Sequence, residues 1–506
     1  MVRHMRKQSY SELWKGQKWK QLRRNLFRLQ RRVYKAVQAG DMRKARSLQK
    51  LILKSRSAQL LAIRQVTQLN QGKKTAGIDG KKALTHKERF KVLKMLGSSA
   101  DNWTHQGLRE IPIPKKNGST RILKVPTISD RAWQCLAKFA LEPAQEATFH
   151  ARSYGFRTGR SAHDAQKYIF NHLRSRSNGI NKRVIELDIK KCFDRISHQS
   201  IMKRLIAPQG LKIGIYRCLK AGINPEFPEQ GTPQGGVVSP LLANIALNGI
   251  EDIHPSVRYA DDMVFFLKPK DKADKILTKI STFLAERGME ISEEKTKQTK
   301  ATDGFDFLGW HFLVQKNGKL RSFPSKENRR AVLKKIKAIA NCSNYGAKVK
   351  AKKLAPIVRG WRNYHRHCSK MDDSPNNLWF ANKAASRKFR KEKKVDRYEA
   401  KRLVKKAFPE VKHSEHKHTM VKGTKSPYDG DLVYWSQRNT ELYNNATSET
   451  LKKQNHSCGY CELRFIDEER VHLHHIDGNH DNWKKNNLMA VHQSCHQYIH
   501  GSKSKD

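Results

Sequence analysis

The sequence predicts a multidomain α+β protein that ends in a small metal-binding module. Its 506 residues are enough for roughly three or four domains. Short apolar runs that carry acids, as strands do, lie in the middle of the chain, whereas helical patterns dominate its first 64 residues and the stretch from 325 to 385. The last 56 residues hold eight of the 22 histidines and three of the eight cysteines.

The charge of the chain predicts a polyanionic partner. Lysine and arginine number 102 against 46 acidic residues, which gives a net charge of +56. Such an excess makes a compact chain repel itself unless a polyanion neutralises it, and nucleic acid is the obvious candidate. The charge alone does not distinguish RNA from DNA.

The expected compartment is a reducing interior without a membrane partner. Five of the cysteines are scattered singly and the other three have metal-like spacing, which argues against a disulfide framework. No apolar run approaches the roughly 18 residues that a membrane span needs. The bacterial cytoplasm, in association with the nucleoid, or an organellar matrix fits this pattern.

Residues 1–64 are expected to form a basic helical N-terminal extension. They contain nineteen lysines and arginines against only Glu12 and Asp41. Apolar residues recur at helical spacing in two runs that are separated by Ala39-Gly40-Asp41. We interpret this as two helices of an RNA-binding arm, the alternative being a solvated charged hairpin.

Two acid-bearing strands in the middle of the chain suggest a metal site. Asp188 lies within the expected strand 184–189, and Asp261 and Asp262 form the bend of an expected hairpin. Buried carboxylates need compensation, so the pair either lies in an exposed turn or holds a metal. If the two strands are neighbours, the three acids can hold two Mg²⁺ ions that activate a hydroxyl and bind a triphosphate.

The order of these motifs resembles a known family. The Phe193-Asp194 pair after the first acid, the run Gly231-Thr232-Pro233-Gln234-Gly235-Gly236 and Tyr259-Ala260-Asp261-Asp262 are similar to the palm of group II intron-encoded reverse transcriptases. The resemblance implies a right-hand polymerase, with fingers and palm over residues 65–320 and deoxynucleoside triphosphates as substrates. It also assigns the three acids Asp188, Asp261 and Asp262 to catalysis and metal binding.

The same resemblance implies further substrate contacts in the polymerase. Residues 111–126 are expected to form a β-hairpin that turns at Asn117-Gly118. By the resemblance, Lys115 and Arg121 of this hairpin hold the triphosphate, and the ring of Phe193 excludes a 2′-hydroxyl. The turn at Gln234 approaches template or nucleotide, and Lys295 gives a proton to pyrophosphate. Arg157 and Arg160 either contact template phosphate or are simply solvated. Phe305 to Trp310 resembles a primer-grip hairpin.

Helices are expected again after the palm. Runs at 329–340, 349–368 and 376–389 have helical spacing, and residues 354–365 resemble the thumb signature of intron maturases. The resemblance implies a helical thumb, the maturase domain, over residues 321–385. Residues 386–445 are expected to be a basic DNA-binding segment or a solvated linker, because the stretch 383–425 looks too polar to form much core.

The C-terminal residues 446–506 have the spacing of two metal sites. Cys458 and Cys461 with His492 and Cys495 form two ligand pairs of the kind that structural Zn²⁺ prefers. The remaining motif residues, His474-His475, Asn487, His496 and His500, resemble an HNH nuclease with its ββα-metal fold. That resemblance makes His475 the general base and His474, His496 and His500 the ligands of a single Mg²⁺ or other divalent ion. A purely structural zinc finger is the alternative, and His492 departs from the cysteine pairs common in this family.

Together these motifs resemble a multifunctional group II intron-encoded protein. The resemblance implies an RNA-directed DNA polymerase, a maturase that helps the intron RNA splice, and an HNH endonuclease that nicks double-stranded DNA to prime reverse transcription during retrohoming. Its partners would be group II intron RNA, the DNA target and nucleotides, with no membrane. A splicing factor with vestigial enzymatic sites and a domesticated reverse transcriptase serving defence are the rival hypotheses.

Overall fold

The computed structural model describes most of the chain. The described residues are 9–114, 118, 120–222, 225–369, 378–392, 395–431, 433–435, 438, 443, 445–463, 465 and 471–502. Within these ranges no helix combines the length and the apolar character needed to cross a membrane.

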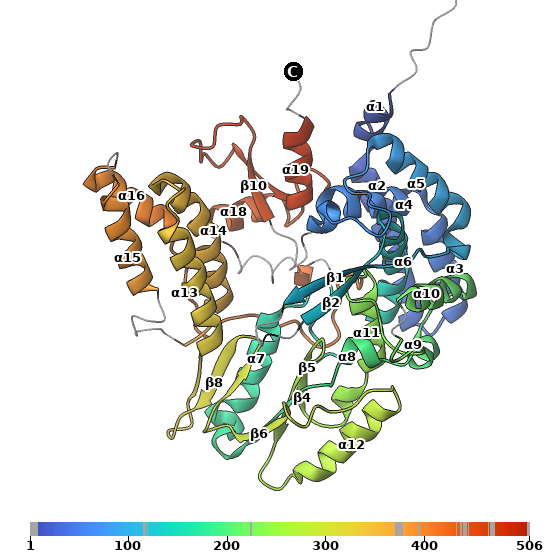
Figure 1. Cartoon of the computed structure of the whole chain (residues 1–506), viewed down its shortest axis with the longest axis horizontal. Helices are drawn as coiled ribbons and strands as arrows, with labels where there is room; N and C mark the ends of the chain where they lie inside the picture. The colour runs from blue at the N-terminus through green and yellow to red at the C-terminus, as the bar shows by residue number, and fades with distance from the viewer. Residues whose placement is uncertain are drawn as a thin grey trace, which may run out of the picture.

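The described N-terminal residues, 9–64, form four helices that pack on the body of the protein. The bounds are Tyr10–Lys15 for α1, Trp19–Gln38 for α2, Met42–Lys54 for α3 and Arg56–Arg64 for α4. The α2–α3 turn contains Gly40 at φ 75°, and Asp41 caps α3 by accepting a hydrogen bond from the Lys44 amide. Their apolar faces share one buried core with α6 (Ile128–Glu146), so the extension is part of the body and not a separate arm (Figure 1).

The fingers carry the expected hairpin. Strands β1 (Arg109–Pro114) and β2 (Thr120–Val125) pair antiparallel, with Ile113 opposite Arg121. Gly118 has a φ of 82°, as a tight turn requires. Lys115 and Asn117 lie outside the described residues. Helix α5 (His86–Ser99) packs on α4, and helix α7 (Ala162–Leu173) packs on the palm sheet.

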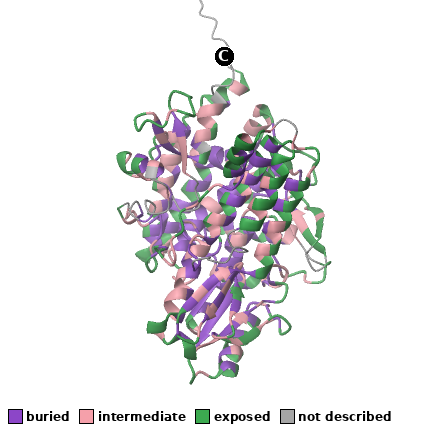
Figure 2. Ribbon diagram, turned by 90° about the vertical axis from the view of Figure 1, so that its left-hand side faces the viewer, coloured by how far each residue is buried: buried purple, intermediate pink, exposed green. Residues whose placement is uncertain are grey.

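The palm is a four-stranded antiparallel sheet in the order β4-β5-β3-β6. Its strands are β3 (Arg183–Leu187), β4 (Ser256–Tyr259), β5 (Asp262–Leu267) and β6 (Lys297–Lys300). Alternate side chains point to opposite faces. Ile185 and Phe265 join the core shared with α6, whereas Val184 and Phe266 join a second core with α7. The interior of this sheet is therefore buried on both faces (Figure 2).

Short helices surround the palm sheet. They are α8 (Cys192–Arg195), α9 (His198–Arg204), α10 (Gln209–Ala221), α11 (Ser239–Leu247) and α12 (Ala273–Ala285). A second sheet follows, made of β7 (Phe305–Phe307), β8 (Trp310–Val314) and β9 (Leu320–Pro324) in that order. The hairpin expected at Phe305 to Trp310 is thus β7–β8, extended by a third strand.

The described residues of the thumb form four helices, one more than the sequence predicted. They are α13 (Lys326–Asn341), α14 (Ala347–His365), α15 (Trp379–Arg390) and α16 (Arg397–Ala407). Helix α16 buries Leu403 and Val404 in the thumb core beside Leu354 and Val358 of α14. The prediction that residues 383–425 are too polar for core was wrong, because a few apolar residues at helical spacing suffice for one buried face.

The segment after the thumb is anchored in the protein. Asp164, at the start of α7, accepts hydrogen bonds from the Val421 amide and from Arg438, and His418 lies 3.1 Å from the same carboxylate. The chain then forms a small module with helix α18 (Asn445–Lys453), strands β10 (Val471–His475) and β11 (Leu488–His492), and helix α19 (Gln493–Ser502). Helix α19 lies near the N-terminal helices (Figure 1).

Candidate functional sites

Three carboxylates meet at one end of the palm sheet. The register that pairs Leu187 with Met263 continues so that Asp188, the residue after β3, faces Asp262 at the start of β5. Tyr259 pairs with Asp262 across a tight turn in which Ala260 has a φ of 60°. Asp261 occupies the other position of this turn. Asp188 and Asp262, which are 74 positions apart in the chain, therefore share one site.

The charges of these carboxylates interact strongly. Desolvation by the surrounding protein, and then the negative charges of Asp261 and Asp188, raise the pKa of Asp262 to about 6. Desolvation and the charge of Asp188 also raise the pKa of Asp261, although Arg121 opposes them. Carboxylates that resist ionisation in this way are stabilised by a cation, and hard oxygen ligands suit Mg²⁺. The donor set thus fits divalent metal.

Two of the predicted cations reach this site. Lys295 Nζ lies 3.5 Å from Asp188 Oδ1, and its side chain is largely exposed. Arg121 of β2 is near enough for its charge to lower the pKa of Asp261. Both side chains therefore border the carboxylates, one from the end of the palm and one from the fingers hairpin. The third predicted cation, Lys115, lies outside the described residues.

The glutamine turn and the aromatic residue are held next to each other. The Gln234 side chain donates through Nε2 to Asp194 Oδ1 at 3.1 Å. The backbone carbonyl of Gln234 accepts a hydrogen bond from the Lys124 amide of β2 at 2.8 Å. The Thr232 amide donates to the carbonyl of Phe193 at 2.7 Å. The turn therefore links fingers and palm. Phe193 is half-buried and packs at the edge of the core.

Both interpretations of Arg157 and Arg160, contact with template phosphate and simple solvation, were wrong. Arg157 is 1% exposed and pairs with Glu146 through two hydrogen bonds of 2.6 and 3.0 Å. Arg160 is also buried and donates to the carbonyls of Ala151 and Gly423. Both side chains therefore stabilise the interior of the protein and do not face solvent. Their hydrogen bonds replace those to water that a guanidinium loses on burial.

A buried ion pair behind the catalytic hairpin was not anticipated. Arg258 of β4 donates through Nε to Glu251 Oε1 at 2.6 Å and through Nη1 to Asn244 Oδ1 at 2.8 Å. Its Nη1 also lies 3.3 Å from the carbonyl of Ala260 in the turn. Arg258 directly precedes the Tyr-Ala-Asp-Asp motif, so its position in the sequence could have indicated a role at this turn. Glu251 lies in no recognisable motif, so no sequence pattern indicated its pairing with Arg258.

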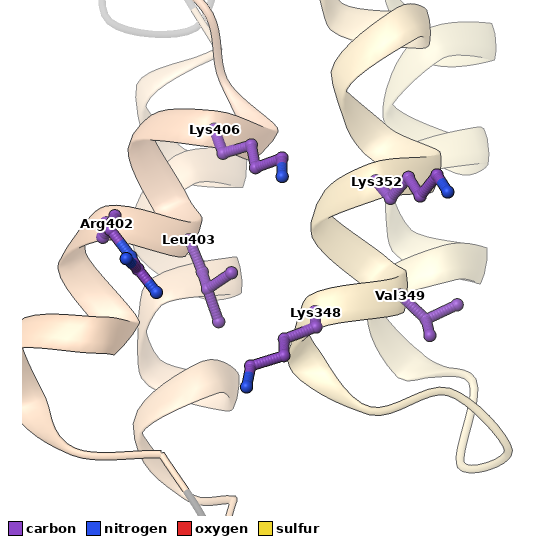
Figure 3. Close-up of a pocket in the computed structure, with 6 residues that line it drawn as sticks. All are labelled: Lys348, Val349, Lys352, Arg402, Leu403 and Lys406. Carbon is purple, nitrogen blue, oxygen red and sulfur yellow. The ribbon is translucent and has the colours of Figure 1, made fainter. Parts of the chain in front are cut away.

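The thumb presents a basic cleft between α14 and α16. The cleft has a volume of about 480 Å³ and is lined by Lys348, Val349, Lys352, Arg402, Leu403 and Lys406 (Figure 3). Glu399 pairs with Lys348 at 3.2 Å and Arg402 at 3.7 Å. Lysine and arginine side chains combine a positive charge with an apolar aliphatic chain. A cleft lined by them can therefore bind the phosphate backbone of a nucleic acid.

Two groups of potential metal ligands lie in the C-terminal module. Within the part of the chain that the structure describes, only these two have three or more ligand atoms all within 4.8 Å of one another: Cys458, Cys461, His492 and Cys495 in one, and His474, His496 and His500 in the other. The palm carboxylates are more widely spaced than this. The first group is buried and contains the donors of a tetrahedral zinc site.

The histidine group joins a strand to a helix. His496 and His500 are four residues apart on α19, with their Nε2 atoms 3.2 Å apart, and His474 comes from β10. Desolvation and then the neighbouring histidine His500 lower the pKa of His496 to about 4. Neutral imidazoles are the form that binds metal.

The predicted general base and its supporting asparagine also lie in this module. His475 is 5% exposed, and its ring lies 5.1 Å from those of His480 and Trp483. Alternation along the strand turns it away from His474. Asn487 accepts a hydrogen bond from the Ile476 amide at 2.9 Å, and its side chain pairs with Asp477.

Comparisons with known proteins agree with the palm and thumb. The family model described as reverse transcriptase (RNA-dependent DNA polymerase) matches residues 113–312. The model for the N-terminal domain of reverse transcriptase matches residues 14–96, and that for the group II intron maturase-specific domain matches residues 329–406. The fold and the palm site therefore define a reverse transcriptase.

Related proteins narrow this class to one family. Maturase-like protein 1 of Euglena gracilis is 41% identical over 77% of this chain and 85% of its own length, and its counterpart from Euglena longa is 36% identical over 77% and 86%. The group II intron-encoded protein LtrA of Lactococcus lactis subsp. cremoris is 28% identical over 50% of this chain and 54% of its own length. The chain belongs to the group II intron reverse transcriptase/maturase family.

Proposed function

We propose that the palm copies RNA into DNA with Asp188, Asp261 and Asp262 as ligands of two divalent ions, most suitably Mg²⁺. When bound, these ions supply charge neutralisation for the primer hydroxyl and the nucleotide phosphates. The observation that carries this proposal is the group of three carboxylates at one sheet end, where burial and then mutual repulsion raise the pKa values of Asp261 and Asp262. Such repulsion is costly unless cations offset it.

Residues around the carboxylates would bind and orient the nucleotide. Arg121 and Lys115 of the fingers hairpin would hold the triphosphate. Gln234 would support the nucleotide or template through its turn, and the ring of Phe193 would press against the sugar so that a 2′-hydroxyl is excluded. Lys295, which lies 3.5 Å from Asp188, would give a proton to the leaving pyrophosphate. Positioning and charge neutralisation account for most catalysis of this reaction class.

Primer extension on an RNA template tests the polymerase. Asp261→Ala should abolish DNA synthesis while intron RNA binding and splicing remain. Asp274→Asn is the matched control, because Asp274 lies exposed in the first turn of α12, away from the site. Retained synthesis in Asp261→Ala, with loss of splicing in its place, would refute these roles.

The thumb and N-terminal helices would bind the intron RNA and assist its folding. The basic cleft between α14 and α16 supports this, since four cations line it. The maturase domain then includes α16, which ends at residue 407. Residues 408–431 are held on the protein, for example by the bond of the Val421 amide to Asp164. Their exposed cations would be the contacts for DNA. When the protein is purified from its host, the RNA that co-purifies with it should be the group II intron that encodes it.

The C-terminal module would be an HNH endonuclease that nicks the DNA target. His475 would act as general base, the ion held by His474, His496 and His500 would stabilise the leaving oxygen, and the Cys458/Cys461/His492/Cys495 centre would hold structural zinc. His475 is buried and follows the proposed ligand His474 directly in strand β10, which supports this. The nick would leave a 3′-hydroxyl that the palm extends during retrohoming. His475→Ala should abolish nicking but not primer extension. Nicking by this variant would rule out His475 as the general base, and absence of nicking by the wild type would favour a purely structural zinc finger.

A further inference from the structure

The C-terminal module contacts the N-terminal helices through specific polar groups. Glu462 pairs with both Lys20 and Arg24 of α2. The Tyr498 hydroxyl of α19 donates to the carbonyl of Lys15 at 2.9 Å. Arg64 at the end of α4 lies over the Tyr498 ring, 5.4 Å from its centroid. Segments more than 400 residues apart in sequence therefore share an interface, as Figure 1 shows for α19 and α2.

One residue of this interface lies directly on the cysteine and histidine centre. Arg23 Nη1 is 3.6 Å from Cys461 Sγ, 3.5 Å from Cys495 Sγ and 3.3 Å from His492 Nδ1. A single guanidinium group thus contacts three of the four predicted zinc ligands. It comes from α2, whose other face is fixed in the core with α6.

The charge of the centre depends on its metal. Three thiolates and one neutral imidazole around Zn²⁺ carry a net charge of −1, which a guanidinium can neutralise through N–H···S hydrogen bonds. Without metal, nothing holds the two ligand pairs, which are 31 residues apart in the chain, together around Arg23. The guanidinium would then lose the single anionic centre that it contacts. The attraction between module and helix is therefore expected to require the bound ion.

We propose that the Cys458/Cys461/His492/Cys495 centre is a metal-dependent docking point, which holds the C-terminal module on α2 through Arg23. This inference rests on the proposed zinc site and adds a role for it. Zinc would then do more than stabilise the module: it would fix the nuclease relative to the RNA-binding helices. Glu462 and Tyr498 supply the remaining contacts, so the module would have one orientation when loaded.

Hydrogen exchange of the full chain tests the proposal. In the zinc-loaded protein, Arg23→Gln should make the amides of α19 and of residues 458–463 exchange about tenfold faster, the effect of losing one charge-assisted hydrogen bond. Arg28→Gln is the matched control, because it removes the same charge from an exposed position of α2, where Arg28 bonds to Asn25. It should exchange like the wild type.

Metal analysis and a Co²⁺ spectrum of the same samples separate the two proposals. Arg23→Gln should retain its zinc, and in the Co²⁺-substituted protein its thiolate-to-cobalt charge-transfer bands should shift, whereas those of Arg28→Gln should not. Unchanged exchange and unchanged bands in a zinc-loaded Arg23→Gln chain would overturn the docking role and leave the zinc site standing. If the Cys458→Ser variant binds as much zinc as the wild type, these four residues are not the zinc site. That result would overturn both the metal centre and the docking role.

Discussion

Replacement of Arg258 by methionine should loosen the catalytic hairpin from behind. The Arg258 and Glu251 side chains are 1% and 0% exposed, and Nε lies 2.6 Å from Oε1. Methionine fills much of the volume but leaves Glu251 as an unpaired buried carboxylate. Breaking a buried pair in this way costs about 3–5 kcal/mol. Since Arg258 also bonds to the turn at Ala260, the cost should fall on β4 and β5.

A double-mutant cycle isolates the energy of this pair. Arg258→Met/Glu251→Leu removes both charges, so it should regain most of the stability that the single variant loses. Hydrogen exchange of β4 and β5 should be faster by two or more orders of magnitude in Arg258→Met, by the conversion of about 1.4 kcal/mol per tenfold. Primer extension should fall in parallel, because the turn carries Asp261.

The pH dependence gives a second test of the pair. Burial tends to raise the pKa of Glu251, but the charge and hydrogen bond of Arg258 outweigh it and lower the pKa below its usual value. A lowered carboxyl pKa stabilises the fold above its unfolded value near 4.5, and this stability is lost as the pH falls through the folded pKa. The double variant should lose less in acid. Equal exchange in wild type and Arg258→Met, or a double variant no better than the single one, would refute the reasoning.

Three further predictions concern the other sites. At limiting Mg²⁺, primer extension should slow as the pH falls below about 6, because Asp262 takes up a proton at its raised pKa; saturating Mg²⁺ should restore the rate, and a pH-independent rate would contradict this. Removal of two thumb cations, Lys352→Gln/Lys406→Gln, should weaken RNA binding and lower the slope of log affinity against log salt by about 1.4, as two lost phosphate contacts to single strands would; an unchanged slope would mean that the cleft is not used. His496→Ala should abolish nicking and leave RNA-templated synthesis intact in parallel assays, and the reverse result would exchange the assigned roles.

Local patterns predicted much of the fold because each site follows a short signature. Asp188 and the Asp261-Asp262 pair could be assigned because each lies at or near the end of an apolar strand. The Asn-Gly turn indicated the fingers hairpin. The pairs of cysteine and histidine likewise have the spacing that one turn or one helical face requires. The structure brings the ligand atoms of each C-terminal group within 4.8 Å of one another, and it places the palm acids at one end of the sheet. The roles of these residues stay predictions.

Long-range contacts were not predictable from such signatures. Arg157 and Arg160 lie in a Gly-rich loop that reads as exposed, and only the fold reveals Glu146 and the carbonyls that bury them. Helix α16 was missed because its lysines and arginines hide a narrow apolar face. The contact of Arg23 with Cys495 joins chain ends 472 residues apart, and no local pattern contains it.

Iron-mediated cleavage would test the central claim that the palm acids hold divalent ions. Fe²⁺ replaces Mg²⁺ at oxygen-rich sites, and with ascorbate and peroxide it produces radicals that cut the nearest backbone. The full chain should be cut next to Asp188 and next to Asp261, with excess Mg²⁺ protecting both positions and Asp261→Ala losing both cuts. Cleavage at only one of the two positions, or equal cleavage in Asp261→Ala, would contradict a shared metal site.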